Sequence, residues 1–157
     1  MDNYAGTSEF ATYLAQFGDN LPPGARVLNT TGTGAEYPFT ADDGYTAEDL
    51  DVGDLLSFIE ETPYDGIWAC RSLNYIPPVE LFATLKNLRA NLHDGGVYGG
   101  VFTTGAGDHV VEQTLRGDFF RARYPAALVL KLHRQAGFKP VTVSTRPETL
   151  FILAGAD

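Results

Sequence analysis

The feature that most constrains the fold is an alternation of strand and helix segments in the second half of the chain. Residues 64–70, YDGIWAC, are almost all apolar and predict a buried strand. A helix is predicted to begin at Pro77 and Pro78, because proline is favoured in the first helical turn. The next strand is predicted for residues 96–104. This alternation predicts parallel strands with helices packed on both faces of the sheet.

The helix after Pro78 is predicted from apolar residues at helical spacing. This stripe consists of Val79, Phe82, Leu85, Leu88 and Leu92. The segment His93–Gly96 is expected to end the helix, with a glycine in the left-handed cap.

The first half of the chain predicts shorter elements. A helix is predicted for residues 8–17 and a buried strand for residues 26–30. Residues 46–51 predict a short helix, and residues 55–59 predict a helix-like run that Asp54 caps. The interval between the strands is acidic and rich in turn-forming residues.

The C-terminal segment predicts a helix over residues 125–136 that ends at Gly137, followed by strands at 140–145 and 149–154. These two strands are too close in sequence for a crossover helix, so they predict an antiparallel hairpin. The fold class is therefore α/β, a doubly wound, mostly parallel sheet with a C-terminal antiparallel hairpin. We expect residues 1–157 to form one domain.

The net charge of −9, from 20 acidic and 11 basic residues, disfavours a polyanionic partner. Binding of DNA or RNA requires Lys and Arg to displace counterions, so no nucleic-acid partner is expected. One mildly basic stretch is interpreted as a solvated helix face. It comprises Arg116, Arg121, Arg123, Lys131 and Arg134.

The number and spacing of cysteines and histidines argue against disulfide bonds and metal sites. Cys70 is the single cysteine, which excludes an intramolecular disulfide and a zinc site of clustered thiolates. The three histidines lack ligand spacing, so no metal site is expected. No apolar stretch approaches the ~20 residues that span a bilayer, and the first residues do not resemble a secretory signal. We expect a cytoplasmic protein without a membrane partner.

Three segments resemble one known family. They are Tyr64–Pro77, Asp94–Val97 and Gln135–Phe138, and together they place the resemblance over residues 64–157. In this order they resemble the class I S-adenosylmethionine-dependent methyltransferases, in which the first segment forms the fourth strand and ends beside the cofactor. The resemblance implies a Rossmann-like methyltransferase fold and S-adenosylmethionine as cofactor.

The resemblance also implies where the cofactor binds. Open α/β sheets bind ligands at the carboxyl ends of their strands, at the point where strand order reverses. The residues that would bind the cofactor lie at the end of the first strand and in the loop after it, within residues 35–63, and at the end of the fourth strand: Asn29, Gly32, Gly34, Asp54, Leu55, Cys70 and Ser72. Asp54 resembles the acidic residue that contacts the adenine amino group, although it also suits a helix N-cap.

The sequence departs from the family pattern in two places. Asn29 stands near the position of an acidic residue, and Thr31 replaces the first glycine of the loop that follows. Residues 35–63 are too few for the two helices and two strands of the family, so one strand–helix unit is expected to be lost or reduced. The acidic residue that grips the cofactor ribose ends the second strand of the family. Candidates for that role here are Asp42, Asp43 and Glu48.

Tyr75 and Arg71 are the candidate catalytic residues. Tyr75 occupies a position where relatives carry a histidine close to the substrate, although packing is the alternative role. Arg71 would either bind an acidic group of the substrate or fill the space of a lost cofactor. Cys70 has no nearby histidine to activate it, and it is interpreted as an inert thiol. The loop after residue 104, which includes His109, is expected to face the substrate or only solvent.

Two functions remain open at this point. The first is methyl transfer from S-adenosylmethionine to a small-molecule acceptor, which needs positioning more than acid–base side chains. The second is a catalytically inactive domain of the same fold that acts as a protein-binding or assembly subunit, including a homo-oligomer.

Overall fold

The computed structural model describes residues 8–30, 46–49, 62–70, 72–105, 109–114 and 117–156. The helices are α1 (Ser8–Asp19), α2 (Pro78–Ala90), α3 (Ala126–Ala136) and the 3₁₀ helix η4 (Leu73–Tyr75). The strands are β1 (Arg26–Asn29), β2 (Thr46–Asp49), β3 (Tyr64–Cys70), β4 (Leu92–Thr103), β5 (His109–Thr114), β6 (Gly117–Ala122), β7 (Lys139–Arg146) and β8 (Thr149–Gly155). None of the helices described is long and apolar enough to cross a membrane.

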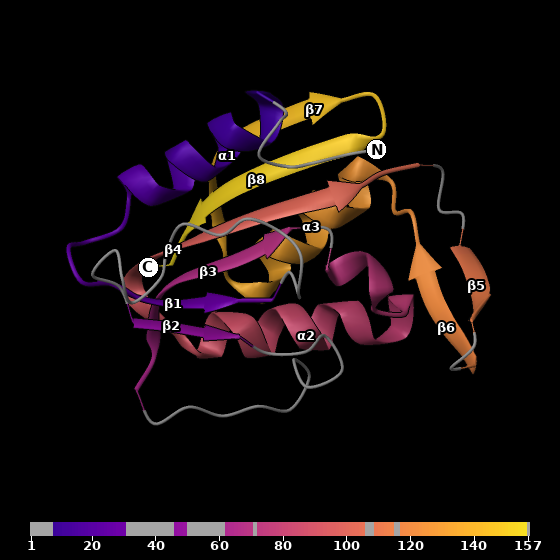
Figure 1. The fold of residues 1–157 in the computed structure, drawn as a ribbon, viewed down its shortest axis with the longest axis horizontal. Coiled ribbons are helices and arrows are strands. Elements are labelled where there is room, and N and C mark those ends of the chain that lie inside the picture. Colours follow the sequence, from indigo (N-terminus) through magenta and orange to yellow (C-terminus); the bar gives the residue numbers. More distant parts are fainter. Residues whose placement is uncertain are drawn as a thin grey trace.

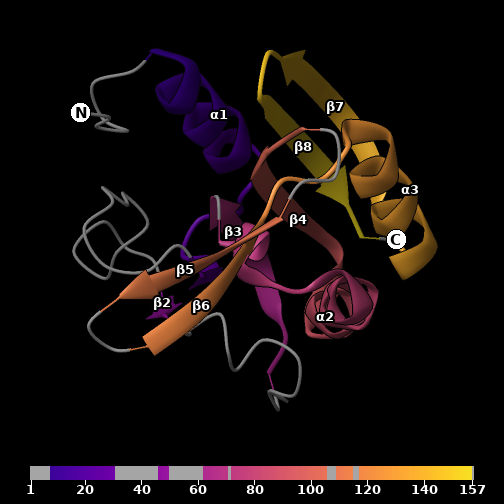
Figure 2. The ribbon, with the colours of Figure 1, turned by 90° about the vertical axis from the view of Figure 1, so that its right-hand side faces the viewer.

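Six of these strands form one sheet in the order β2-β1-β3-β4-β8-β7 (Figure 1). The four strands from β2 to β4 run parallel, and β8 and β7 add an antiparallel hairpin at the edge. Figure 2 shows α1 on one side of the sheet and α2 and α3 on the other. The predicted fold class, a doubly wound sheet with a C-terminal antiparallel hairpin, is therefore confirmed.

Strand β2 corrects the short helix predicted for residues 46–51. Its four residues, TAED, pair in parallel with β1, from Arg26 opposite Thr46 to Asn29 opposite Asp49. Alanine, glutamate and aspartate are all depleted in strands, so local preference gave no strand signal. The main-chain hydrogen bonds to β1 override that preference. The second strand is thus present, and it ends in an acidic residue.

The alternation of side chains along the strands divides the core between the two faces of the sheet. Val27, Trp68 and Val101 pack on the side of α1. Their chain neighbours Leu28 and Ile67 pack on the side of α2 and α3. Strands buried on both faces have near-continuous apolar sequences, which explains why β1 and β3 were predicted correctly.

Two glycines in the middle of β4 give two aromatic rings the space they occupy. A Cβ atom on Gly99 would lie 2.7 Å from the indole ring of Trp68, and one on Gly100 would clash with the hydroxyl of Tyr98. Real Cβ atoms do not approach heavy atoms that closely. The sequence Tyr98-Gly99-Gly100 is therefore a packing solution, with one ring on each face of the sheet.

The predicted face and end of α2 are partly wrong. Val79 is 89% exposed, and Leu81 is buried in its place beside Leu85 and Leu88. The helix ends at Ala90, and its C-cap Asn91 does not adopt the left-handed conformation. Strand β4 begins at Leu92, four residues before the predicted start at Gly96, because Leu92 already pairs with Tyr64 of β3. The regular ladder resumes at Val97 opposite Gly66 after an irregularity.

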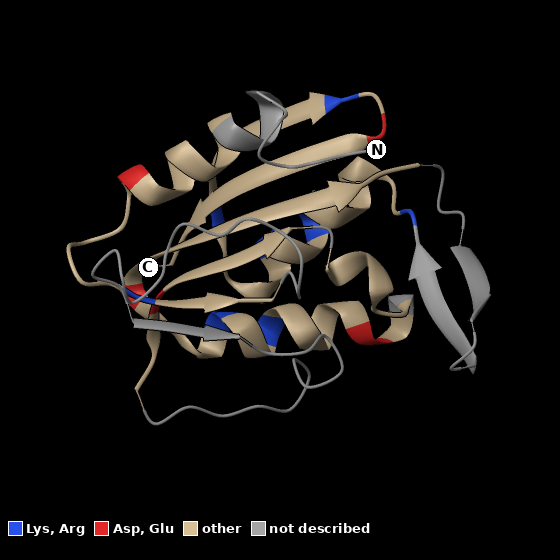
Figure 3. Cartoon of the chain, viewed as in Figure 1, with Lys and Arg blue, Asp and Glu red and all other residues tan. Residues whose placement is uncertain are grey.

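A second, two-stranded sheet of β5 and β6 was not predicted. The two strands pair antiparallel from His109 opposite Ala122 to Thr114 opposite Gly117. Arg121 therefore belongs to a strand, and the basic stretch does not form one helix face. In Figure 3 the basic residues drawn in blue are spread over several elements. We call residues 109–122 the β-ribbon.

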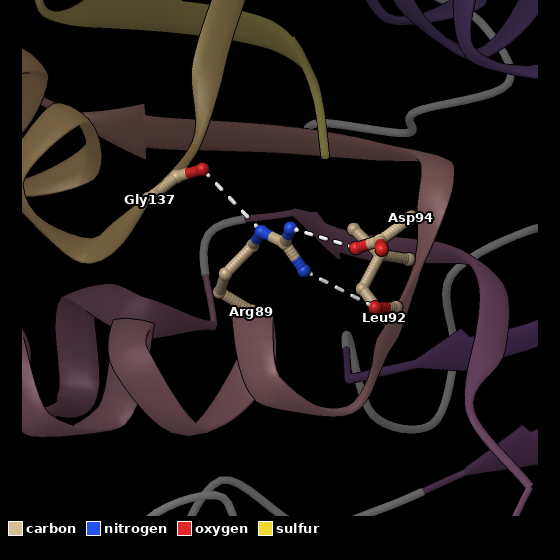
Figure 4. A network of polar contacts seen from close by, with 4 residues as sticks. All are labelled: Arg89, Leu92, Asp94 and Gly137. Atoms are coloured by element: carbon tan, nitrogen blue, oxygen red, sulfur yellow. Dashed lines mark hydrogen bonds and ion pairs between the residues drawn. The ribbon is translucent and has the colours of Figure 1, made fainter. Parts of the chain in front are cut away.

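Arg89 joins three segments at the amino ends of the parallel strands (Figure 4). Its guanidinium donates to the carbonyl of Gly137 at 3.3 Å and to the carbonyl of Leu92 at 3.2 Å. It also contacts a carboxylate oxygen of Asp94 at 3.2 Å. Gly137 adopts the left-handed conformation predicted for the end of α3 (φ 106°). Arg89 therefore ties the ends of α2 and α3 to the start of β4.

His133 and Tyr98 form a fully buried polar pair between α3 and the sheet. The Nδ1 of His133 lies 2.7 Å from the carbonyl of Val129, which can only accept, so Nδ1 carries the proton. The other nitrogen, Nε2, accepts a hydrogen bond from the Tyr98 hydroxyl at 2.9 Å. Burial lowers the pKa of His133 to about 4, and the hydrogen bond to Val129 opposes this shift. His133 is therefore neutral at pH 7.

Replacement of Arg89 by Met should lower the free energy of unfolding by about 1–2 kcal/mol, since the part-buried bond to Leu92 and the exposed bond to Gly137 both lose a charged donor. The control is Asp94→Asn. Asp94 is 86% exposed, so its loss should change the free energy by less than about 1 kcal/mol. Urea denaturation measures both values, and equal losses would contradict the assignment of the stabilisation to the two carbonyls.

Acidification should destabilise the protein through His133. The unfolded chain takes up this proton near pH 6.5 and the folded chain near pH 4, so the unfolded state binds more protons between these values. The contribution of neutral His133 to the free energy of unfolding is fully present above pH 6.5. It falls by about 3 kcal/mol as the pH drops toward 4. In His133→Gln the free energy of unfolding, measured by urea denaturation at each pH, should depend less on pH over this range than in the wild type. The exposed His93, replaced by Gln, is the control, and an equal flattening in both variants would contradict the assignment to His133.

Candidate functional site

The candidate site lies at the carboxyl ends of β1, β2 and β3. Strand β1 pairs with β2 on one side and with β3 on the other, so the order of the strands reverses at β1. Such a reversal separates the connecting segments and leaves a crevice beyond the strand ends. Asn29 ends β1 and is 5% exposed, and the register places Asp49, the last residue of β2, beside it.

Thr30 and Ser72 join the ends of β1 and β3. The Thr30 N–H donates to the carbonyl of Trp68 at 3.0 Å, and the Thr30 hydroxyl contacts the same carbonyl at 3.4 Å. The hydroxyl oxygens of Thr30 and Ser72 lie 2.7 Å apart. Either hydroxyl can be the donor in this short contact. Both residues are buried, so the link is shielded from water.

Tyr75 lies at the surface, three residues beyond this link. It ends η4 and is 42% exposed, whereas Leu73 and Asn74 before it are buried. The next residue, Ile76, accepts a hydrogen bond through its carbonyl from the hydroxyl of Tyr124. Burial raises the pKa of Tyr124 to about 12, so this hydroxyl remains protonated and a donor. The Tyr75 side chain is thus accessible to solvent, while the segment that carries it is fixed by the hydrogen bond between Ile76 and Tyr124.

The β-ribbon stands beside the same edge of the sheet. In Figures 1 and 2 it lies beyond the carboxyl ends of the parallel strands. Thr104, which precedes the β-ribbon, forms a bridge with Tyr124, which follows it. The Gly105 N–H also donates to the carbonyl of Tyr124 at 3.2 Å. The segment after β4 therefore leaves the sheet and returns to the same point. His109, which was predicted to lie in a loop, belongs to β5 of this ribbon. Residues 106–108 of the predicted loop lie outside the described residues.

The structure brings together three of the predicted cofactor-binding residues: Asn29, Cys70 and Ser72. The thiol of Cys70 belongs to the core on the α1 side and is buried, as expected for an inert cysteine. Five other predicted residues lie outside the described residues: Gly32, Gly34, Asp54, Leu55 and Arg71.

Sequence reasoning missed Thr30, Asp49 and Asn74. Thr30 could have been found, because it directly follows a predicted buried strand at the edge where ligands bind. Asp49 was hidden by the incorrect helix at 46–51, and Glu48 was considered instead. No local pattern distinguishes Asn74, whose partner is 29 residues away.

A separate cavity of about 430 Å³ lies at the opposite edge, between the end of α1 and the starts of β4 and β7. Gln16, Gly95, Gly155 and Val141 contribute to its lining. It contains none of the predicted site residues. No group of three His, Cys, Asp or Glu residues suited to a metal occurs within the ranges that the structure describes.

The fold is shared with solved methyltransferase structures. One is 1,6-didemethyltoxoflavin-N1-methyltransferase of Burkholderia thailandensis, bound to 1,6-didemethyltoxoflavin and S-adenosylhomocysteine, with a TM-score of 0.75, 16% identity and coverage of 98% of this chain and 81% of that one. Another is a putative S-adenosylmethionine-dependent methyltransferase of Listeria monocytogenes, with a TM-score of 0.71, 14% identity and coverage of 94% and 97%.

A third is the glycopeptide N-methyltransferase MtfA in complex with S-adenosylhomocysteine, with a TM-score of 0.67, 15% identity and coverage of 100% and 92%. No protein-family model matches the sequence, and no curated protein matches it. The chain therefore has the class I methyltransferase fold that the sequence predicted, in a reduced form.

The link between Thr30 and Ser72 should appear as a coupling energy. Thr30→Val and Ser72→Ala each remove one hydroxyl, and the double variant should be less destabilised than the sum of the two. We expect a coupling of about 0.5–1.5 kcal/mol from urea denaturation. Strict additivity would show that the two hydroxyls do not interact.

Proposed function

We propose that the protein is an S-adenosylmethionine-dependent methyltransferase that acts on a small-molecule acceptor. The observation that carries this proposal is the reversal of strand order at β1, which brings the carboxyl ends of β1, β2 and β3 to one edge. The known methyltransferases of this fold support the choice of cofactor, because two of them were crystallised with S-adenosylhomocysteine.

The residues at this edge suit the polar parts of such a cofactor. Asn29 ends β1, and its carboxamide oxygen can accept a hydrogen bond from an ammonium group. Asp49 ends β2, where the resemblance places the acidic residue that grips the ribose. In this proposal Asp49 takes the role for which Glu48 was first considered. Gly32 and Gly34 follow Thr30 in the sequence and belong to the expected cofactor loop.

Methyl transfer requires mainly that the acceptor be held in line with the methyl group. S-adenosylmethionine, when bound, supplies that methyl group on a positively charged sulfur. The residues of the chain position the cofactor and the acceptor. Ser72 and Thr30 fix the ends of β3 and β1, and Tyr75 has an accessible ring and hydroxyl near these strand ends. We assign Tyr75 to the acceptor side of the site. Arg71, which precedes Ser72, is assigned to an acidic group of the acceptor.

The β-ribbon supports an acceptor site on the same side. It lies next to η4, which carries Tyr75, and both lie at the carboxyl edge. The B. thailandensis enzyme was solved with 1,6-didemethyltoxoflavin, and this supports a small molecule as the class of acceptor. The net charge of −9 disfavours a polyanion as the acceptor.

One observation favours the second candidate, an inactive domain that acts as a binding or assembly subunit. Asn29 is a buried neutral residue where the family pattern has an acid, so the site lacks one charge that would hold the cofactor's ammonium group. In that case Arg71 would occupy the space of the cofactor. Arg71→Ala would then create binding rather than abolish it.

S-adenosylhomocysteine and S-adenosylmethionine should both raise the melting temperature and give a titration heat. Ligand at 100 times its dissociation constant should stabilise the folded state by about 2.7 kcal/mol. ATP is the ligand control, since it shares the adenosine but carries a polyphosphate. The titration should be repeated at low and high salt. Absence of a shift at millimolar ligand in both conditions contradicts the proposed cofactor.

The variant Asn29→Ala tests the placement of the cofactor. Loss of about one net hydrogen bond should weaken S-adenosylhomocysteine roughly tenfold. The matched control is Asn91→Ala, because Asn91 is equally buried but lies at the opposite edge of the sheet. An equal effect of the two variants would place the ligand elsewhere.

A further inference from the structure

Strand β4 extends beyond the end of its neighbour β3. The register between the two strands ends with Cys70 opposite Val101, whereas β4 continues to Thr103. On its other side β4 remains paired with β8 as far as Thr103 opposite Thr149. The main chain of Thr103 therefore faces, on the β3 side, a position that the β3 ladder does not fill.

The carboxamide of Asn74 fills that position. The Thr103 N–H donates to Oδ1 of Asn74 at 2.9 Å, and Nδ2 of Asn74 donates to the Thr103 carbonyl at 2.9 Å. A carboxamide has one donor group and one acceptor side by side, as a peptide unit does. Asn74 is 2% exposed, so both bonds form away from bulk water. Asn74 thus replaces a strand residue opposite Thr103.

This contact completes the support of residues 72–76, which we call the brace. The brace is bonded to the end of β1 through Ser72 and Thr30. It is also bonded through Ile76 to Tyr124, and we call the bridged pair Thr104 and Tyr124 the foot of the β-ribbon. Asn74 lies between these two contacts and bonds the brace to the end of β4. Tyr75 is the exposed residue of this fixed segment.

The partner of Asn74 also connects the brace to the β-ribbon. Thr103 is followed by Thr104, which bridges Tyr124, and by Gly105, whose N–H bonds to the same residue. The point at which the β-ribbon leaves the sheet is therefore adjacent to the main-chain groups that Asn74 holds. Movement of this point would displace both Tyr75 and the β-ribbon.

We propose that Asn74 is a positioning residue of the site, which sets the place of Ser72 and Tyr75 and the foot of the β-ribbon without touching a ligand. The proposal rests on the proposed function, because its effect on binding requires the cofactor at the carboxyl edge. It assigns a role to a residue that neither the sequence pattern nor the resemblance singled out.

The test compares Asn74→Leu, a variant of similar size without polar groups, with Asn91→Leu. Asn91 has the same residue type and similar burial, and its Nδ2 bonds to the carbonyl of Asn87 at 2.8 Å, far from the site. S-adenosylhomocysteine binding is measured by calorimetry well below both melting temperatures. Amide exchange is measured for peptides that cover β5 and β6. Asn74→Leu should weaken binding about tenfold and accelerate exchange in the β-ribbon, while Asn91→Leu should change neither more than about twofold.

The variant Asn74→Asp provides a conservative rescue. A protonated carboxyl group has one donor and one acceptor, as the carboxamide has, whereas a carboxylate has only acceptors. Burial favours the protonated form, so this variant should bind weakly at pH 8 and recover toward wild-type affinity at pH 6. Affinities are compared with the wild type at each pH, which removes the effects of other titrating groups.

The outcomes separate the two proposals. Absence of binding by the wild type overturns the proposed cofactor and, with it, this role of Asn74. Wild-type binding with equal losses in Asn74→Leu and Asn91→Leu, or with no recovery of Asn74→Asp at pH 6, overturns the positioning role alone. A lower melting temperature of Asn74→Leu with unchanged affinity and unchanged exchange shows a purely structural residue and also overturns it.

Discussion

The structure depends on the parallel pairing of β1 with a strand on each side. These pairings place β2 and β3 against the same short strand and direct their carboxyl ends to one edge. Four residues of β1 are enough, because the strand is buried and its side chains enter the core on both faces of the sheet. The site follows from this arrangement, since ligands in open α/β sheets bind where the strand order reverses.

The edge is then completed by hydrogen bonds between segments that are far apart in the sequence. Thr30 and Ser72 are separated by 42 residues, Asn74 and Thr103 by 29, and Ile76 and Tyr124 by 48. Each bond satisfies a polar group that burial has removed from water, and an unmade bond there would be destabilising. Together they hold a segment without long regular structure in one place, as the proposed methyl transfer would require.

Much of the fold could be predicted because its signals are local. The apolar runs of β1 and β3 identify strands that are buried on both faces, and Gly137 identifies the end of α3. The close spacing of β7 and β8 requires a hairpin. Of the site, Asn29, Cys70 and Ser72 could be placed at the carboxyl edge, because they follow or end strands whose direction was already predicted.

The sequence by itself determined the layers, the direction of the strands and the edge at which a ligand would bind, because apolar periodicity and chain connection are local properties. Only the tertiary structure decided that residues 46–49 are a strand, since polar TAED gains its hydrogen bonds from β1. It also decided that residues 109–122 form a ribbon and that Asn74 replaces a strand residue. These features depend on partners distant in sequence, and no local preference encodes them.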